Sequence, residues 1–136
     1  MVKSFALFGK QISFEFIKFA LVGVTNTFLH LAILYILVEY FSVYYVLASF
    51  IAFLVAVTNS FILNTIWTFK QDIKYKVGFR YSKFFIISTI AAVVNLSLLY
   101  AITEFFGVWY IFSQLIATFF SLIVNFVGNK FWTFKD

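Results

Sequence analysis

A chain of 136 residues with 64% hydrophobic residues, 11% charged residues and a mean hydropathy of +1.03 is too apolar for a water-soluble globular domain. Ten basic residues against five acidic ones give a net charge of +5, and the lack of Cys excludes disulfides and thiol chemistry. The length leaves room for one compact body, so we expect a single membrane domain over residues 1–136.

Four stretches lack Asp, Glu, Lys and Arg and are long enough to cross a bilayer as a helix, which takes about 20 apolar residues. They are Phe19–Val38, Tyr44–Trp67, Phe84–Thr103 and Trp109–Phe131. We therefore predict an all-α membrane protein with four transmembrane helices, multi-pass in the cell membrane. The first stretch is too long for a signal peptide and has no small-residue cleavage site after it, so we expect it to stay in the mature protein.

The chain carries one pattern twice. The string Asn-x-x-Trp-Thr-Phe-Lys occupies residues 64–70 and returns 65 positions later, at residues 129–135. The same shift, without gaps, aligns identical residues at about a third of the positions between Phe14 and Gln71. Because a fixed internal period indicates a duplicated unit, we predict two two-helix repeats, about residues 14–71 and 79–136.

The basic residues gather at three places in the chain. They lie before the first stretch, between the second and third, and at the end: Lys3, Lys10, Lys18, Lys70, Lys74, Lys76, Arg80, Lys83, Lys130 and Lys135. The short segments 39–44 and 104–109 contain none of them and carry one Glu each. Since positive charge stays on the cytoplasmic side, we predict that both termini and the central loop are cytoplasmic. The two repeats would then insert the same way up, as parallel repeats.

Polar side chains inside the stretches follow helical spacing. In the fourth stretch they recur at steps of three and four and so share one face: Gln114, Thr118, Ser121, Asn125 and Asn129. Such stripes let membrane helices pack through hydrogen bonds. Asn125 and Asn129, with Lys130 beside them, also form a donor-rich cluster suited to a phosphate or a sugar hydroxyl. The residues alone leave both interpretations, packing and ligand binding, open.

The other polar positions are Asn26 and His30 in the first stretch, Asn64 in the second and Asn95 in the third. The 65-residue shift places His30 on Asn95. A lone His in a helix bundle more often packs through a hydrogen bond than carries protons. We therefore predict a packing role for His30.

The sequence offers little for enzyme chemistry. Glu39 and Glu104 belong to the short segments outside the spans, one His cannot make a metal site, and no Gly-rich phosphate loop occurs. We expect no catalytic site, no metal and no cofactor. The basic residues flank membrane spans and have no soluble domain to organise them, so we do not expect nucleic acid as a partner either.

Three segments carry a resemblance to a known family: FIKFALVGVTNTFLHLAILYIL (residues 16–37), NSFILNTIWTF (59–69) and NFVGNKFWTF (125–134). The chain resembles the GtrA-like family, small four-helix membrane proteins associated with cell-surface polysaccharide synthesis, from about Phe14 to Phe134. The second half matches the family's ending fully, at Asn125, Phe126, Asn129, Lys130, Trp132 and Phe134. In the first half, Ser60 and Thr65 replace the first Asn and the basic residue, so the resemblance suggests that the second half carries the working copy.

The resemblance implies a flippase that moves polyprenyl-phosphate-linked sugars, typically on undecaprenyl phosphate, from the inner to the outer leaflet. A membrane glycosyltransferase would then use the sugar to decorate a surface polysaccharide or teichoic acid. In this hypothesis the substrate-binding residues at the inner mouth are Asn125, Asn129 and Lys130, with Trp132 fixing their depth. The other candidate residues of the polar path are Asn64, Asn26, His30 and Asn95.

Two further possibilities accompany this hypothesis. Four helices make a narrow path, so a homo-oligomer or a complex with the transferase would make more room. The alternative function is a non-transporting membrane subunit that anchors or organises a glycosyltransferase.

Overall fold

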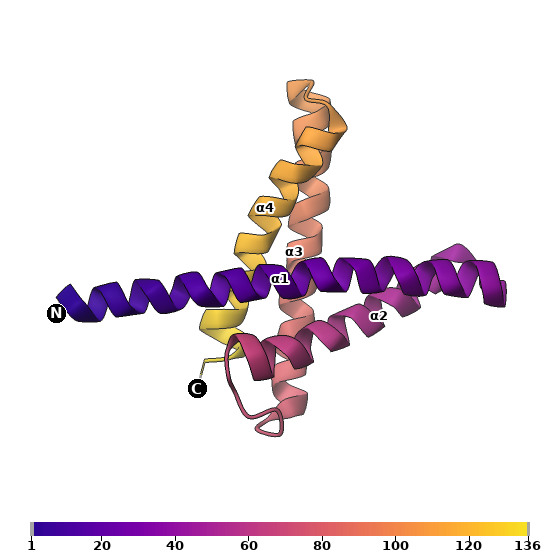
Figure 1. Ribbon diagram of the computed structural model, residues 1–136. Helices are drawn as coiled ribbons and strands as arrows, with labels where there is room; N and C mark the ends of the chain where they lie inside the picture. The colour runs from indigo at the N-terminus through magenta and orange to yellow at the C-terminus, as the bar shows by residue number, and fades with distance from the viewer. Residues whose placement is uncertain (1, 136) are drawn as a thin grey trace. The chain divides into compact units, whose positions relative to one another are not determined.

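The computed structural model describes residues 2–135, and their side chains from Ser4 onward. The described chain contains four long helices, α1 (Val2–Phe41), α2 (Tyr45–Leu63), α3 (Val77–Phe106) and α4 (Tyr110–Gly128) (Figure 1). A five-residue π-helical turn follows α2 and another follows α4: η1 (Asn64–Thr68) and η2 (Asn129–Thr133). All four helices are long and apolar enough to cross a membrane, which confirms the predicted all-helical class and its four spans.

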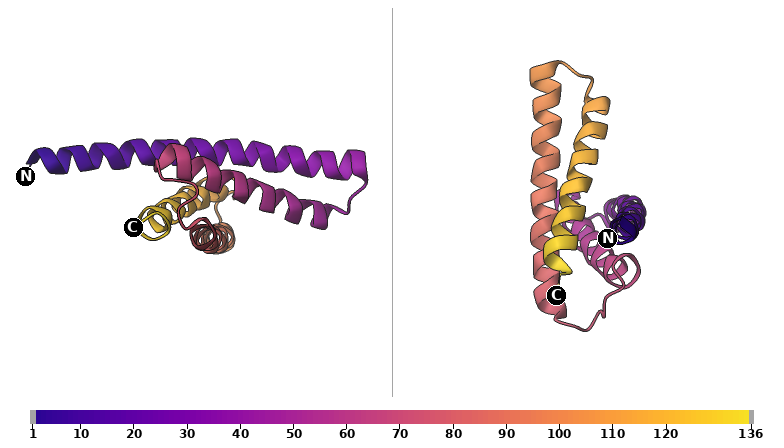
Figure 2. Two further views of the ribbon diagram at one scale, coloured as in Figure 1. Left: turned by 90° about the horizontal axis from the view of Figure 1, so that it is seen from below. Right: turned by 90° about the vertical axis from the view of Figure 1, so that its left-hand side faces the viewer.

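The chain divides into two compact units, residues 1–75 and residues 76–136. In the first unit α2 folds back along α1 and η1 contacts α1; in the second, α4 folds back along α3 and η2 contacts α3 (Figure 2). Each unit is therefore a helical hairpin. We call the end with the short connection between the helices the turn end, and the opposite end, at η1 or η2, the open end.

At the open end, the first helix of each hairpin extends beyond the predicted span. The helix α1 begins at Val2, well before Phe19, because Lys and Glu are good helix formers and nothing between residues 2 and 19 interrupts the helix. A charge-free run delimits the part of a helix that suits lipid and does not delimit the helix itself. Under the 65-residue shift the start of α3, Val77, corresponds to Ile12, so α1 is ten residues longer at this end.

At the turn end, the first helix of each hairpin ends in the same way. Ser42 and Gly107, 65 positions apart, have φ angles of 54° and 64°, in the left-handed region that ends a helix. After Ser42 the N–H of Val43 donates to the carbonyl of Leu37 at 3.0 Å. Gly adopts this conformation freely, whereas any other residue type costs roughly 1–2 kcal/mol there.

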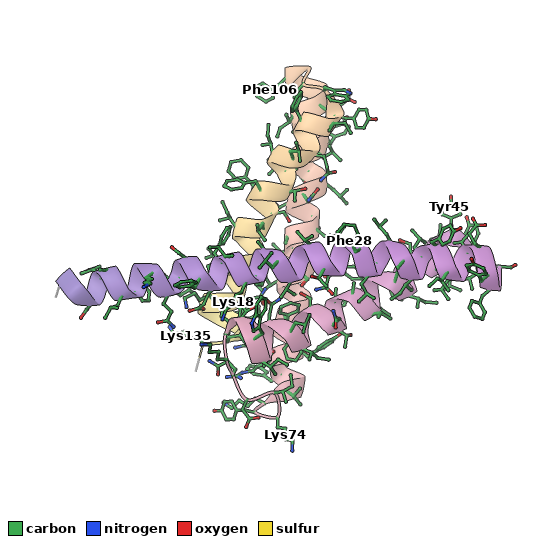
Figure 3. The ribbon with its side chains drawn as sticks, in the orientation of Figure 1. Lys18, Phe28, Tyr45, Lys74, Phe106 and Lys135 are labelled. Atoms are coloured by element: carbon green, nitrogen blue, oxygen red, sulfur yellow. The ribbon has the colours of Figure 1, made fainter. Side chains whose placement is uncertain are left out.

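Aromatic rings gather near both turn ends. The Tyr35 and Tyr40 rings lie 6.2 Å apart, and their counterparts under the shift, Tyr100 and Phe105, also lie 6.2 Å apart. Figure 3 marks Tyr45 and Phe106 at the turn ends of the two hairpins. Belts of amphipathic rings are typical of a membrane–water interface.

Small residues line many of the contacts within the hairpins, while most of the large apolar ones face outward. Ala48, Ala52 and Ala117 are fully buried, which lets helix backbones approach closely. Phe28, by contrast, is 69% exposed (Figure 3), and many other Phe, Leu and Ile side chains are also exposed. An apolar outer surface with small residues inside is what a lipid environment favours.

Candidate functional site

The repeated string forms the π turns at the two open ends. The N–H of Phe69 donates to the carbonyl of Asn64 at 2.9 Å, and the N–H of Phe134 donates to that of Asn129 at 2.9 Å. Both bonds reach five residues back instead of the four of an α-helix, so each hairpin ends in a widened turn.

The Asn side chain of each string lies inside this turn. The hydroxyl of Thr68 donates to Asn64 Oδ1 at 2.7 Å, and the hydroxyl of Thr133 donates to Asn129 Oδ1 at 2.7 Å. Both asparagines have no exposed surface, and both threonines are buried. A buried polar pair of this kind is costly to disrupt, because either partner left alone stays unsatisfied.

The amide nitrogens of these asparagines bond one helical turn back. Asn64 Nδ2 donates to Ser60 Oγ at 3.1 Å, and Asn129 Nδ2 donates to Asn125 Oδ1 at 2.6 Å and to its carbonyl at 2.8 Å. The carboxamide of Asn129 is thus engaged within its own helix end. It fixes the direction of the Asn125 side chain, which is only half-buried.

The Phe of each string packs back onto the first helix of its hairpin. The rings of Phe69 and Phe19 have centroids 6.3 Å apart, and those of Phe134 and Phe84 also lie 6.3 Å apart. These aromatic contacts join the end of each hairpin to its first helix.

The Trp of each string meets a lysine of the same first helix. Lys18 Nζ lies 5.4 Å from the ring centroid of Trp67, and Lys83 Nζ lies 5.2 Å from that of Trp132. Both distances are within cation–π range. We call the Asn–Thr bond, the Phe pair and the Lys–Trp pair together the clasp; the sequence indicated it only through the matched 65-residue spacing of its members.

Amide side chains bridge the two helices of each hairpin farther from the open end. Asn59 Nδ2 donates to Asn26 Oδ1 at 2.9 Å in the first unit, and Gln114 Nε2 donates to Asn95 Oδ1 at 3.0 Å in the second. In the second unit Ser121 Oγ also donates to the carbonyl of an α3 residue, at 2.8 Å. The polar stripe of α4 therefore faces α3 and supports helix packing.

The two bridges do not correspond under the 65-residue shift. The counterparts of Asn95 and Gln114 in the first unit are His30 and Ser49, and these two residues line a hollow of about 460 Å³ with aromatic side chains of α2. We call it the His30 groove. Where Gln114 and Asn95 join the helices of the second hairpin, the first hairpin has a groove beside His30.

The structure places the eight predicted site residues in four settings. Asn125, Asn129, Lys130 and Trp132 lie together at the end of α4 and in η2, where Asn129 is enclosed and Trp132 is 43% exposed. Asn64 occupies the enclosed position of η1. Asn26 and Asn95 belong to the amide bridges and His30 to its groove, so the structure does not gather all eight into one pocket. Among the described side chains, His, Asp and Glu form no group of three that could hold a metal ion.

Four apolar helices with paired polar groups between them define a multi-pass membrane protein. Residues 18–136 match the model of the GtrA/DPMS transmembrane domain, and the chain belongs to this family. The match confirms the resemblance found in the sequence.

Two relatives show where such a domain occurs. The chain is 31% identical over 120 residues to a Bacillus subtilis (strain 168) protein described as "Uncharacterized membrane protein YngA", a match that covers 88% of this chain and 78% of the relative. It is 30% identical over 114 residues to the "Dolichol-phosphate mannosyltransferase" of Pyrococcus furiosus, which covers 84% of this chain and 32% of that protein.

Proposed function

We propose that this protein moves polyprenyl-phosphate-linked sugars, such as those on undecaprenyl phosphate, across the cell membrane. The sugars would serve the glycosylation of a cell-surface polysaccharide or teichoic acid. The observation that carries the proposal is the match of most of the chain to a protein named for a reaction on a polyprenyl phosphate. The family relationship supports it over residues 18–136.

A polar head group crosses hydrocarbon only where hydrogen-bonding groups replace water. Asn26 and Asn95 place such groups within the spans, and a head group would have to displace the amides that now bond to them. The His30 groove supplies space and a further polar side chain. A homo-oligomer, or a complex with a membrane glycosyltransferase, would enclose a wider path than one chain does.

At the open end of the second hairpin we assign the phosphate or sugar contact to Asn125 and Lys130, with Trp132 at the membrane boundary. Asn129 supports this contact from inside the turn by holding Asn125. Asn64 has the corresponding place in the first hairpin, where it bonds to Ser60. Thr65 stands there at the position that Lys130 has in the second hairpin.

A second function has one specific observation in its favour. The matching segment is about a third of the Pyrococcus furiosus protein, so there the domain is part of a longer mannosyltransferase chain. A separate chain of this family could therefore anchor or organise a glycosyltransferase without transporting its substrate.

Proteoliposomes separate the two functions. A fluorescent polyprenyl-phosphate sugar is placed in both leaflets, and an impermeant quencher reports how fast the inner pool reaches the outside. The flippase proposal requires exchange well above that of protein-free vesicles, and Lys130→Ala should slow exchange at limiting substrate about 10- to 100-fold, since a charge-assisted phosphate contact is lost. Lys74→Ala, in the exposed loop, is the control and should leave the rate unchanged. Exchange no faster than in empty vesicles would reject transport and favour the anchoring function.

His30 gives a further test of the path in the same assay. If this side chain only packs, His30→Asn should retain the exchange rate, because Asn95 already stands at the equivalent position of the second hairpin. A large loss of exchange with normal protein levels would instead make the imidazole part of the transport step.

A further inference from the structure

The first hairpin has a second hollow at its open end, and lysines surround it. This cavity of about 580 Å³ lies between the N-terminal part of α1 and the segment that follows η1. Its charged lining residues are Lys10, Lys18, Lys70 and Glu15. Three cations against one carboxylate leave two positive charges in excess. We call it the lysine cavity.

The walls of the lysine cavity are held in place by the clasp. Thr68, on its border, is buried and bonded to Asn64, and Phe69 packs on Phe19. Lys70 follows directly, with a φ of 50°, a left-handed conformation that costs a non-glycine residue free energy. The backbone therefore carries Lys70 to the cavity from a fixed turn.

The opposite wall is a lysine-bearing face of α1. Lys10, Phe14 and Lys18 follow one another at steps of four, so they lie on one side of the helix. Lys10 Nζ lies 5.9 Å from the ring centroid of Phe14, and Lys18 Nζ lies over Trp67. These cation–π contacts hold the two ammonium groups beside aromatic rings at the edge of the cavity, where they can meet an anion.

The depth of the lysine cavity suits a lipid head group. From Phe19 to Val38 the helix is about 30 Å long, close to the thickness of the hydrocarbon core. With the turn end at one boundary, Lys18 lies at the other boundary, and Lys10 lies about 12 Å beyond it. A volume of about 580 Å³ exceeds what a phosphate alone fills and lies in the range of sites for small organic ligands.

The two hairpins differ at this site. The pair of Lys18 with Trp67 has its counterpart in Lys83 with Trp132, but the residues 65 positions after Lys10 and Glu15 are Tyr75 and Arg80. Lys10 belongs to the ten-residue extension of α1, and it precedes the segment that matches the family. The lysine cavity is thus a feature of this chain's own N-terminal helix.

We propose that the lysine cavity binds the phosphate of an isoprenoid phosphate lipid, together with the first sugar attached to it. Lys10, Lys18 and Lys70 contact the phosphate, and Gln11 offers an exposed amide to the sugar hydroxyls. This inference rests on the proposed function, for which it names a first binding site in the first hairpin. The isoprenoid chain stays in the surrounding hydrocarbon.

The direct test is binding of radiolabelled farnesyl phosphate to the purified full chain in detergent. We expect saturable binding that Lys10→Gln, Lys18→Gln and Lys70→Gln each weaken about 10- to 100-fold, because each removes one charge-assisted contact. Lys74→Gln is the control: it removes a lysine of the exposed loop, outside both candidate sites, and should leave the affinity unchanged. Equal weakening by Lys74→Gln, or full affinity in the triple lysine variant, would overturn the site.

Competition identifies which part of the ligand is recognised. Unlabelled farnesyl phosphate should displace the label, whereas inorganic phosphate and farnesol should each compete at least 10-fold more weakly, since each keeps only part of the contact. Inorganic phosphate that competes as well as the lipid would make this a site for free phosphate. Farnesol that competes as well would make it an apolar site, and either result overturns the proposal.

Tryptophan emission locates the bound ligand. With Trp109→Phe and Trp132→Phe in place, the remaining Trp67 lies 5.4 Å from Lys18 Nζ. We expect farnesyl phosphate to change its emission with the affinity found by radioligand binding. Unchanged emission at saturating ligand would place the ligand elsewhere and overturn the site.

Leaflet exchange then separates this site from the function it serves. If the triple lysine variant loses binding and the unmodified protein exchanges lipid-linked sugar normally, exchange by the variant should fall about 10-fold or more at limiting substrate. Unimpaired exchange by that variant would reject the lysine cavity as the entry site and leave the flippase intact. Binding without any exchange by the unmodified protein would reject transport and retain the site.

Discussion

Asn64 and Asn129 stabilise the open ends of the two hairpins from inside the π turns. Each is enclosed, and each accepts a hydrogen bond from a threonine four residues on. The sequence alone could not separate this role from ligand binding, because a carboxamide near a membrane boundary suits both. The signal that was available is the repeated Asn-x-x-x-Thr spacing, which a π turn brings into contact.

We predict that Asn64→Ala and Asn129→Ala each lower the free energy of unfolding, by about 1–3 kcal/mol, because each leaves a buried threonine hydroxyl without its acceptor. Unfolding by SDS titration of the purified variants measures this. The paired change Asn129→Ala with Thr133→Val removes both partners and should recover most of the loss. An Asn129→Ala protein as stable as the unmodified one would show that the bond contributes nothing. If the loss is found, reduced activity of this variant alone cannot identify a ligand contact, which makes Lys130→Ala the sharper probe.

At the scale of elements, the four spans follow from composition and the helix ends do not. The predicted stretches Tyr44–Trp67 and Trp109–Phe131 begin within one residue of α2 and α4. The start of α1 could not be placed from a charge count, since charged residues at the open end continue the helix. The π turns were also missed, because a shift from four- to five-residue hydrogen bonding leaves no mark in hydropathy.

The turns between the helices give a matched pair of substitutions. Ser42 and Gly107 have left-handed φ angles, and a Cβ at Gly107 would meet nothing within 4 Å, so only the backbone distinguishes the two residue types there. Ser42→Gly should therefore raise the thermal unfolding temperature in detergent, and Gly107→Ser should lower it, each for roughly 1 kcal/mol. Unchanged unfolding temperatures would mean that these turns relax freely, and changes of opposite sign would contradict the conformational cost.

Close packing within the second hairpin gives another prediction. A Cβ on Gly128 would lie 2.9 Å from Ile87 Cγ2 and 2.7 Å from its Cδ1. Ile is stiff in a helix, so Gly128→Ala should cost about 1–3 kcal/mol. The first hairpin has the reverse sizes at these positions, Leu63 with Val22, so Ile87→Val in the same chain should restore part of the loss.

The same SDS titration measures this packing effect. Gly23→Ala, where a Cβ would meet nothing within 4 Å, is the control and should not destabilise. A Gly128→Ala variant that unfolds like the Gly23→Ala control would contradict the tight contact.

At the scale of the whole molecule, the proposal is a duplicated hairpin whose two copies cross the membrane in the same direction. The clasp, the left-handed turn residue and the aromatic pair recur in both units at the 65-residue shift. The hairpins differ at two places. An amide bridge joins the helices of the second hairpin where the first hairpin has the His30 groove. The lysine cavity lies beside α1, which is longer than α3. These differences lie where the 65-residue shift pairs unlike residues or where α1 extends beyond α3, and the resulting contacts could not be predicted from the matching positions.

Labelling of single cysteines tests this account most directly, because the direction of transport and the side of the lysine cavity both depend on it. The chain has no Cys, so Ser42→Cys, Glu104→Cys and Lys74→Cys each give one reactive site. In intact cells an impermeant maleimide should label the cysteines at Ser42 and Glu104, and should reach the one at Lys74 only after the membrane is permeabilised. Labelling of only one of the two turn-end cysteines, or of Lys74→Cys alone, would contradict the account.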